Sequence, residues 1–138
     1  MYSNYTQLFI HLVWATWNRL PLITDDVQTE LYSAIAAKCI AIRCQPLAIG
    51  GIADHVHTLI RMPTTISVAE IAKDIKGSSS HLMTHNILPE TAFKWQGSYG
   101  AFSVSKSGVE RVIAYIHNQK VHHESQHLIS ELELCHEP

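Results

Sequence analysis

The sequence predicts one α+β domain of the ferredoxin-like, or split β-α-β, class, in which two helices cover one face of an antiparallel sheet. Three observations predict it. Segments with strand and helix character follow one another in the order β-α-β-β-α-β, with further helical segments after the last strand. The chain has 138 residues, which suits a single domain. Its hydrophobic content of 46% is enough for a core without disulfides.

Strands are expected where β-branched and aromatic residues cluster between turn signals. The first, residues 7–16, is apolar at nearly every position, which indicates a central strand buried on both faces. A short strand over residues 46–52 leads through a tight turn into a third strand over residues 55–62. Residues 99–105 form the fourth expected strand.

Helices are expected where apolar residues recur every three or four positions behind a capping residue. Thr24, followed by two aspartates, starts the first helix. Residues 67–70 and 107–110 both match the capping-box pattern, and they start the second helix and the helix after the last strand. A final amphipathic segment is expected around residues 125–135.

The charge balance changes along the chain. The formal net charge is −2, from 10 basic and 12 acidic residues. This low net charge together with the 46% hydrophobic content excludes a disordered chain, and the charge balance excludes a strongly basic polymer binder. After Lys120 the chain holds four of the acidic residues and none of the basic ones, so residues 1–120 carry a charge of +2. We therefore expect one domain over residues 1–138, with a core of about residues 5–120 and an acidic helical appendage of about residues 121–138.

Cysteines and targeting signals add little. Cys39, Cys44 and Cys135 form no CxxC pair, so neither a disulfide framework nor a thiolate zinc site is indicated. The first apolar run has no charged region before it, and no stretch approaches the ~18 apolar residues of a membrane helix. We expect a cytoplasmic protein that does not act at a membrane.

The motif His55-Val56-His57 is the first candidate for chemistry. On a strand, residues two apart point to the same face, so both imidazoles can reach one divalent ion. The face of Val56 is expected to lie against the helices, with the two histidines on the open face. The alternative interpretation is a pair of half-exposed surface histidines in a chain with 10 histidines.

Tyr115 and Gln119 are the second candidate. Their i,i+4 spacing places them on one face of the helix after the last strand, with Arg111 one turn earlier on the same stripe. A tyrosine becomes a nucleophile only if its electrophile is activated, and a metal on a phosphate can do so. The alternative is a boundary tyrosine that packs its ring and leaves its hydroxyl in water.

Together these motifs resemble the single-tyrosine HUH transposases, the IS200-like insertion-sequence and REP-associated tyrosine transposases. Val56 is the hydrophobic residue of the HUH motif, and the tyrosine helix reads YIHNQ. The resemblance extends over residues 7–123 through further stretches in the same order: FIHLVWATWNRLPLI, GGIADHVHTLIRMP, IKGSSSHLM, WQGSYGAFSVSKS and YIHNQKVHHE.

The resemblance implies a specific activity. His55, His57 and Gln119 would hold Mg²⁺ or Mn²⁺, and Tyr115 would attack a phosphodiester of single-stranded DNA to form a 5′-phosphotyrosine link and a free 3′-OH. Rejoining with another 3′-OH would complete strand transfer at hairpin-bearing element ends. The family also implies a homodimer, commonly with the tyrosine helix of one subunit completing the metal site of the other.

Further residues are expected to support the site or to contact DNA: Asp54, Lys73, Lys76, Ser79, Arg111 and Arg19. The alternative is that these residues occupy turns or solvated surface positions. Asp54 could orient a histidine of the metal site. Trp17 and Trp95 could stack on unpaired bases, whereas Trp14 fits the core better. His122 and His123 are expected not to be ligands.

Two other functions stay open at this point. A split β-α-β sheet can also be a non-catalytic module that binds single-stranded nucleic acid. A metal-dependent phosphodiesterase could use His55 and His57 to activate water, in which case Tyr115 would be dispensable.

Overall fold

A central sheet with helices on both faces forms the core of the protein. The computed structural model describes residues 4–87, 93–125 and 130–135. The strands pair antiparallel in the order β2-β3-β1-β4. Their bounds are β1 Phe9–Ala15, β2 Gln45–Ile52, β3 His55–Arg61 and β4 Gly100–Val104. The predicted four-stranded antiparallel sheet with its helices is therefore confirmed, and β1 is a central strand as expected.

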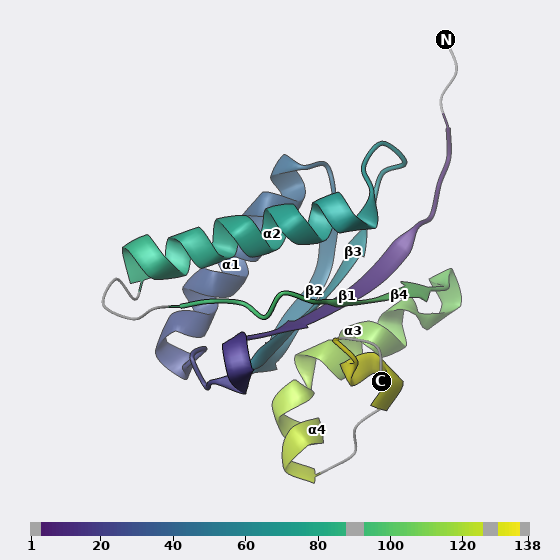
Figure 1. Cartoon of the computed structure of the whole chain (residues 1–138). Coiled ribbons are helices and arrows are strands. Elements are labelled where there is room, and N and C mark those ends of the chain that lie inside the picture. The colour runs from purple at the N-terminus through teal and green to yellow at the C-terminus, as the bar shows by residue number, and fades with distance from the viewer. Residues whose placement is uncertain (1–3, 88–92, 126–129, 136–138) are drawn as a thin grey trace.

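Two long helices cover one face of the sheet, and the C-terminal elements cover the other (Figure 1). The first face carries α1, Asp25–Ala41, and α2, Val68–Leu82. The second carries α3, Val109–His117, α4, Gln119–Ser125, and the short 3₁₀ helix η4, Ser130–Glu133. Other short helices are η1, Trp17–Arg19, η2, Met83–Ile87, and η3, Lys106–Gly108.

Each face of the sheet has its own apolar core. The larger one joins β1 and β3 to α1 and α2, with Trp14, Leu31 and Ile60 fully buried in it. The smaller one packs Leu59 of β3 against Ile116 of α3. Truncating such a core leucine or isoleucine to alanine typically costs about 2–5 kcal/mol.

One capping box forms as predicted and the other does not. The Ser67 hydroxyl accepts the backbone N–H of Glu70 at 3.1 Å, which starts α2. At the second site, η3 precedes α3, Gly108 is the capping residue, and the Ser107 hydroxyl instead bonds that of Ser105 at 3.2 Å. The predicted box fails because the 3₁₀ turn moves Ser107 away from the first turn of α3. Of the final predicted segment, residues 126–129 lie outside the described residues.

Two glycines let the C-terminal elements approach the sheet closely. A Cβ atom at Gly50 of β2 would lie 2.4 Å from the backbone oxygen of Ile116, so α3 can lie here only against a glycine. A Cβ atom at Gly100 of β4 would lie 1.8 Å from the backbone oxygen of Leu134. Both contacts bring C-terminal segments directly against the sheet.

No helix in the described ranges is long and apolar enough to span a bilayer.

Candidate active site

The histidine pair lies at the start of β3, on the face covered by α3. Because side chains alternate along a strand, His55, His57 and Leu59 share this face, and Leu59 packs against Val112 and Ile116 of α3. The two histidines are only 2% and 0% exposed. The structure therefore contradicts the alternative of two half-exposed histidines, since the C-terminal elements close over the face that was expected to be open.

Tyr115 and Gln119 reach the same place from α3 and α4. The two helices are separated only by Asn118, so the i,i+4 relation is kept. The Oε1 of Gln119 lies 3.2 Å from Nε2 of His55, and the Tyr115 ring lies 6.0 Å from the His57 ring, centre to centre. Both side chains are buried, at 1% and 4% exposure. One chain thus brings together the four residues of the HUH and tyrosine motifs.

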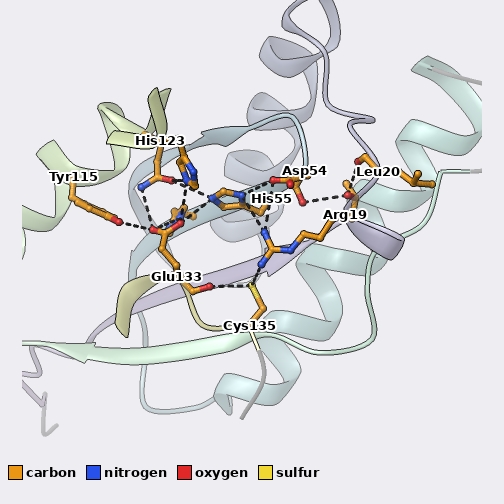
Figure 2. A network of polar contacts seen from close by, with 11 residues as sticks. Arg19, Leu20, Asp54, His55, Tyr115, His123, Glu133 and Cys135 are labelled. Carbon is orange, nitrogen blue, oxygen red and sulfur yellow. Dashed lines mark hydrogen bonds and ion pairs between the residues drawn. The ribbon is translucent and has the colours of Figure 1, made fainter. Parts of the chain in front are cut away.

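A carboxylate that the sequence pattern did not indicate lies at the centre of this group. One oxygen of Glu133, from η4, is 3.2 Å from Nε2 of His55, and the other is 3.2 Å from Nε2 of His57. The Tyr115 hydroxyl donates a hydrogen bond of 2.6 Å to the same carboxylate, as Figure 2 shows. Glu133 therefore connects the tyrosine to both histidines. Its position depends on the path of the chain after α4, which no local pattern reveals.

The two histidines after the tyrosine motif also belong to this region. Nε2 of His123 lies 3.1 Å from Oε1 of Gln119 and 3.2 Å from Oε1 of Glu133. The ring of His122 stacks on Tyr115 with the ring centres 4.7 Å apart. The i,i+4 spacing of Gln119 and His123 is the signal in the sequence that could have placed His123 at the site.

The polar atoms at the centre of the site are spaced to hold one divalent ion. Ligand atoms of His55, His57 and Glu133 all lie within 4.8 Å of one another. An octahedral ion with ligands at 2.0–2.2 Å separates neighbouring ligands by about 3 Å and opposite ones by about 4 Å. The measured 3.2 Å from Nε2 of His55 to Gln119 and to Glu133 fits neighbouring positions. Two imidazoles with amide and carboxylate oxygens are donors that divalent metal ions accept, so this cluster could hold one ion.

The remaining ring nitrogens of both histidines are also occupied. Nδ1 of His55 lies 2.8 Å from Oδ1 of Asp54, the residue expected to orient a histidine. Nδ1 of His57 lies 2.8 Å from Nε2 of His11, which comes from the neighbouring strand β1. Such partners fix the ring orientation and the tautomer of a ligand histidine.

Charges in the site are unevenly distributed. Burial opposes protonation of His55, but its hydrogen bonds to Asp54 and Glu133 outweigh burial and raise its pKa to about 9. Burial lowers the pKa of His57, which faces only one carboxylate and is repelled by His55. The pKa of Glu133 lies far below its ordinary value, because the contacts of its carboxylate with His55, His57 and the Tyr115 hydroxyl overcome the effect of burial. Without a metal, the raised pKa favours a positively charged His55 between the two carboxylates, and the Arg19 guanidinium adds a second positive charge 3.7 Å from Asp54.

Arg19 is the expected DNA-contacting residue that lies closest to this network. Its guanidinium is 3.7 Å from Asp54 and 3.4 Å from Nδ1 of His55, with the side chain about half exposed. A cleft of about 340 Å³ adjoins it, and Arg19, Gln96, Ser98 and Cys135 are among its lining residues. Arg19 thus stands between the cleft and the histidine pair, and Figure 2 shows it reaching from η1 toward His55.

The other expected contact residues lie elsewhere. Lys73 is exposed on α2, across the sheet from the histidine pair, and Arg111 is exposed on α3. The Lys76 ammonium donates to two backbone oxygens of the segment before β4, at 2.7 and 3.1 Å. The Ser79 hydroxyl is buried and accepts the indole N–H of Trp95 at 3.0 Å. Lys76 and Ser79 therefore hold the chain segment that leads into β4.

The tryptophans differ in their access to solvent. Trp14 is fully buried as expected and Trp95 is 6% exposed, so neither presents a free ring face. Trp17 is 40% exposed, and the Lys94 ammonium lies 4.0 Å from the centre of its ring. Trp17 is thus the tryptophan with a ring available for stacking.

Comparisons with known proteins identify the family of the chain. The profile of the family described as "Transposase IS200 like" matches residues 4–119. No protein of curated function matches the chain. A Deinococcus radiodurans R1 protein described as a candidate transposase has a similar crystal structure, with a TM-score of 0.70 and 24% identity over 86% of this chain and 95% of that chain. A REP-associated tyrosine transposase bound to a REP hairpin has a TM-score of 0.66 and 16% identity over 89% of this chain and 73% of that chain.

These two identities support the fold, whereas the profile match covers most of the chain and supports the family. The chain therefore belongs to the IS200-like transposase family.

Proposed function

We propose that this transposase cleaves and rejoins single-stranded DNA through a covalent link to Tyr115, at element ends that carry a hairpin. The observation that carries the proposal is the meeting of the nucleophile and the metal ligands at one point. The Tyr115 hydroxyl is 2.6 Å from the Glu133 carboxylate, whose oxygens lie 3.2 Å from both His55 and His57. A role in packing alone does not require a hydroxyl among buried imidazoles.

The proposed reaction exchanges one phosphorus–oxygen bond for another. The phenol oxygen of Tyr115 forms a bond to phosphorus, and the bond from phosphorus to the 3′ oxygen breaks. The phenol loses its proton and the departing 3′ oxygen gains one, which leaves a 5′-phosphotyrosine and a free 3′-OH. Attack by another 3′-OH reverses these steps and restores the tyrosine. The phosphodiester energy stays in the covalent link, so no nucleotide cofactor is needed.

His55, His57 and Gln119 would hold a divalent ion, with Glu133 as a further oxygen ligand in the absence of DNA. The bound ion would neutralise charge that develops on the phosphoryl oxygens. The chain itself orients the group: Asp54 and His11 bond the outer nitrogens of the two histidines. Arg19 at the adjoining cleft provides a positive charge where a DNA strand would approach.

The test uses synthetic oligonucleotides that each carry one hairpin and a random single-stranded tail, incubated with the protein and Mn²⁺ or Mg²⁺. A 3′ label should shift to the mass of a protein–DNA adduct on a denaturing gel, because the protein holds the 5′ phosphate. A 5′ label should instead appear on a shorter free strand that ends in a 3′-OH. Tyr115→Phe should abolish both products, and Tyr99→Phe is the matched control that should keep them.

Each alternative function gives a different result in this assay. A phosphodiesterase would cut the strand without an adduct and would tolerate Tyr115→Phe. A non-catalytic binding module would retain the oligonucleotides without cutting them and without a requirement for metal. Either result would refute the proposed function, as would an adduct that survives in Tyr115→Phe.

A homodimer is the assembly that we propose from the family, and the site suggests how its subunits would act. Tyr115 lies beside the histidines of its own chain, so each subunit would cleave with its own tyrosine. Mixing Tyr115→Phe with His57→Ala protein should then restore no adduct. Restored activity in the mixture would instead show that tyrosines act across the dimer.

A further inference from the structure

We propose that His11 is a positioning residue of the metal centre, which accepts the Nδ1–H of His57 and thereby keeps Nε2 of His57 free to bind the ion. This inference rests on the metal site of the proposed function. His11 is part of neither the HUH motif nor the tyrosine motif, and it lies in the apolar first stretch of the resemblance.

The geometry places the two imidazoles side by side on neighbouring strands. Strand register pairs Val13 of β1 with His57 of β3, so His11 lies diagonally opposite His57 on the same face of the sheet. Nε2 of His11 is 2.8 Å from Nδ1 of His57, and the ring centres are 5.0 Å apart. Both side chains are 0% exposed, so water does not compete for this hydrogen bond.

Only one arrangement of protons in this pair is compatible with a metal ligand. A neutral imidazole carries one N–H, and a ligand nitrogen needs a free lone pair. If His57 donates from Nδ1, its Nε2 is unprotonated and faces Glu133 and the proposed ion site. If His11 donates instead, the proton of His57 must sit on Nε2, where it blocks the ion. His11 must therefore act as the acceptor when His57 binds metal.

Packing alone does not explain an imidazole at this position. Nδ1 of His11 is buried without a hydrogen-bond partner among the described residues. A buried polar nitrogen without a partner is unfavourable, and a phenylalanine would fill a similar space without that cost. The neighbouring ring of Phe102, 6.0 Å away, shows that an aromatic side chain fits this layer. The favourable contact that remains for the imidazole is the one with His57.

His11 thus has the same positioning role toward His57 that Asp54 has toward His55. Each bonds the Nδ1 of a candidate ligand at 2.8 Å and leaves its Nε2 pointing into the site. Asp54 is a charged partner and His11 a neutral one, so the pair adds only one negative charge behind the two ligands. Loss of such an outer partner typically lowers metal affinity 10- to 100-fold.

The test compares Mn²⁺ affinity in three variants, measured by calorimetry in the absence of DNA. His11→Phe keeps the ring and removes the acceptor, and we expect a 10- to 100-fold loss of affinity. His11→Gln offers an amide oxygen at a similar reach and should recover most of the loss. Phe102→Leu perturbs the same layer without touching the hydrogen bond and should bind as the wild type does. Thermal unfolding in EDTA should show that His11→Phe remains folded at the temperature of the titration.

A second readout reports the tautomer directly. Nitrogen-15 spectra of the Mg²⁺-loaded protein, assigned with His57→Gln, should show His57 protonated at Nδ1. Wild-type affinity in His11→Phe, equal losses in His11→Phe and His11→Gln, or protonation of His57 at Nε2 would each overturn the inference. Because no DNA is present, failure of the DNA-cleavage test leaves this result interpretable. Absence of Mn²⁺ binding to the wild type would overturn the metal centre and this inference together.

Discussion

The position of His55 between two carboxylates predicts a pH dependence of stability that the metal-free protein should show. Its pKa of about 9 in the folded state compares with 6.5 in the unfolded chain. A raised pKa stabilises the fold fully below pH 6.5, where both states are protonated. The contribution is then lost as the pH rises from 6.5 through 9, because the unfolded chain releases its proton first.

The expected size follows from the two pKa values. Each pKa unit corresponds to about 1.4 kcal/mol, so the charged His55 contributes about 3 kcal/mol below pH 6 and about 1 kcal/mol at pH 8. No reduction for solvent screening is needed, since the side chain is 2% exposed and its partners Asp54 and Glu133 lie within 3.2 Å. For a domain of this size the loss corresponds to a shift of the melting temperature on the order of 10 °C.

The assay is urea unfolding in EDTA at several pH values between 5.5 and 8.5, for the wild type and for His55→Gln. The difference in unfolding free energy between the two proteins isolates His55 from other titrating groups. This difference should shrink by about 2 kcal/mol over that range. A difference that stays constant or grows with pH would refute the idea that the two carboxylates hold His55 in its charged form. Added Mn²⁺ should stabilise the wild type more at high pH, because the ion must displace the His55 proton.

Three further changes have defined outcomes. In the proposed mechanism a phosphate takes the place of the Glu133 carboxylate, so Glu133→Gln would remove negative charge from that place. Filter binding should then show tighter binding of single-stranded DNA, and calorimetry should show weaker Mn²⁺ binding without DNA; the opposite signs would contradict this role. Gly50→Ala would place a methyl group 2.4 Å from the Ile116 oxygen, so it should displace the tyrosine helix, lower stability by about 1–3 kcal/mol and abolish the DNA adduct. Gly77→Ala, with open space around the new methyl group, is the control that should have none of these effects. Burial raises the pKa of Cys39 to about 12, so above pH 9 the thiol loses its proton in the unfolded chain before it does in the folded protein. The unfolding free energy of the wild type should therefore fall with pH by about 1.4 kcal/mol per unit more than that of Cys39→Ala.

The fold could be predicted largely from local patterns. The continuous apolar character of the first strand correctly indicated its central position between β3 and β4. The three-residue spacing between Ser67 and Glu70 correctly indicated the start of α2. The same spacing at Ser107 was misleading, because a pattern of four residues does not reveal that a 3₁₀ turn precedes the helix. Local patterns thus predict an element better than they predict its first turn.

The site was only partly accessible from the sequence, for reasons that lie in tertiary structure. His55 and His57 share a strand, and Tyr115 and Gln119 share a helical stripe, so spacing alone could pair them. Their burial could not be predicted, since it depends on how the C-terminal elements pack over the sheet.

Three other residues of the network were not predicted from the sequence, for related reasons. His11 lies in an apolar run, and its contact with His57 follows from the register of two strands. Glu133 depends on the path of the chain after α4. His123 was recognisable by its helical spacing from Gln119, but a chain with 10 histidines gives that spacing little weight.

The completeness of the site within one chain has a genetic consequence. Tyr115 and the histidine pair come from the same polypeptide. If each subunit cleaves with its own tyrosine, as proposed above, a subunit with a damaged tyrosine would disable only itself. In a cell that makes both intact and damaged copies, the damaged copy would then be recessive, and intact copies would keep their activity in mixed assemblies. An arrangement that exchanges tyrosines between subunits would instead make each damaged copy a dominant inhibitor of its partners.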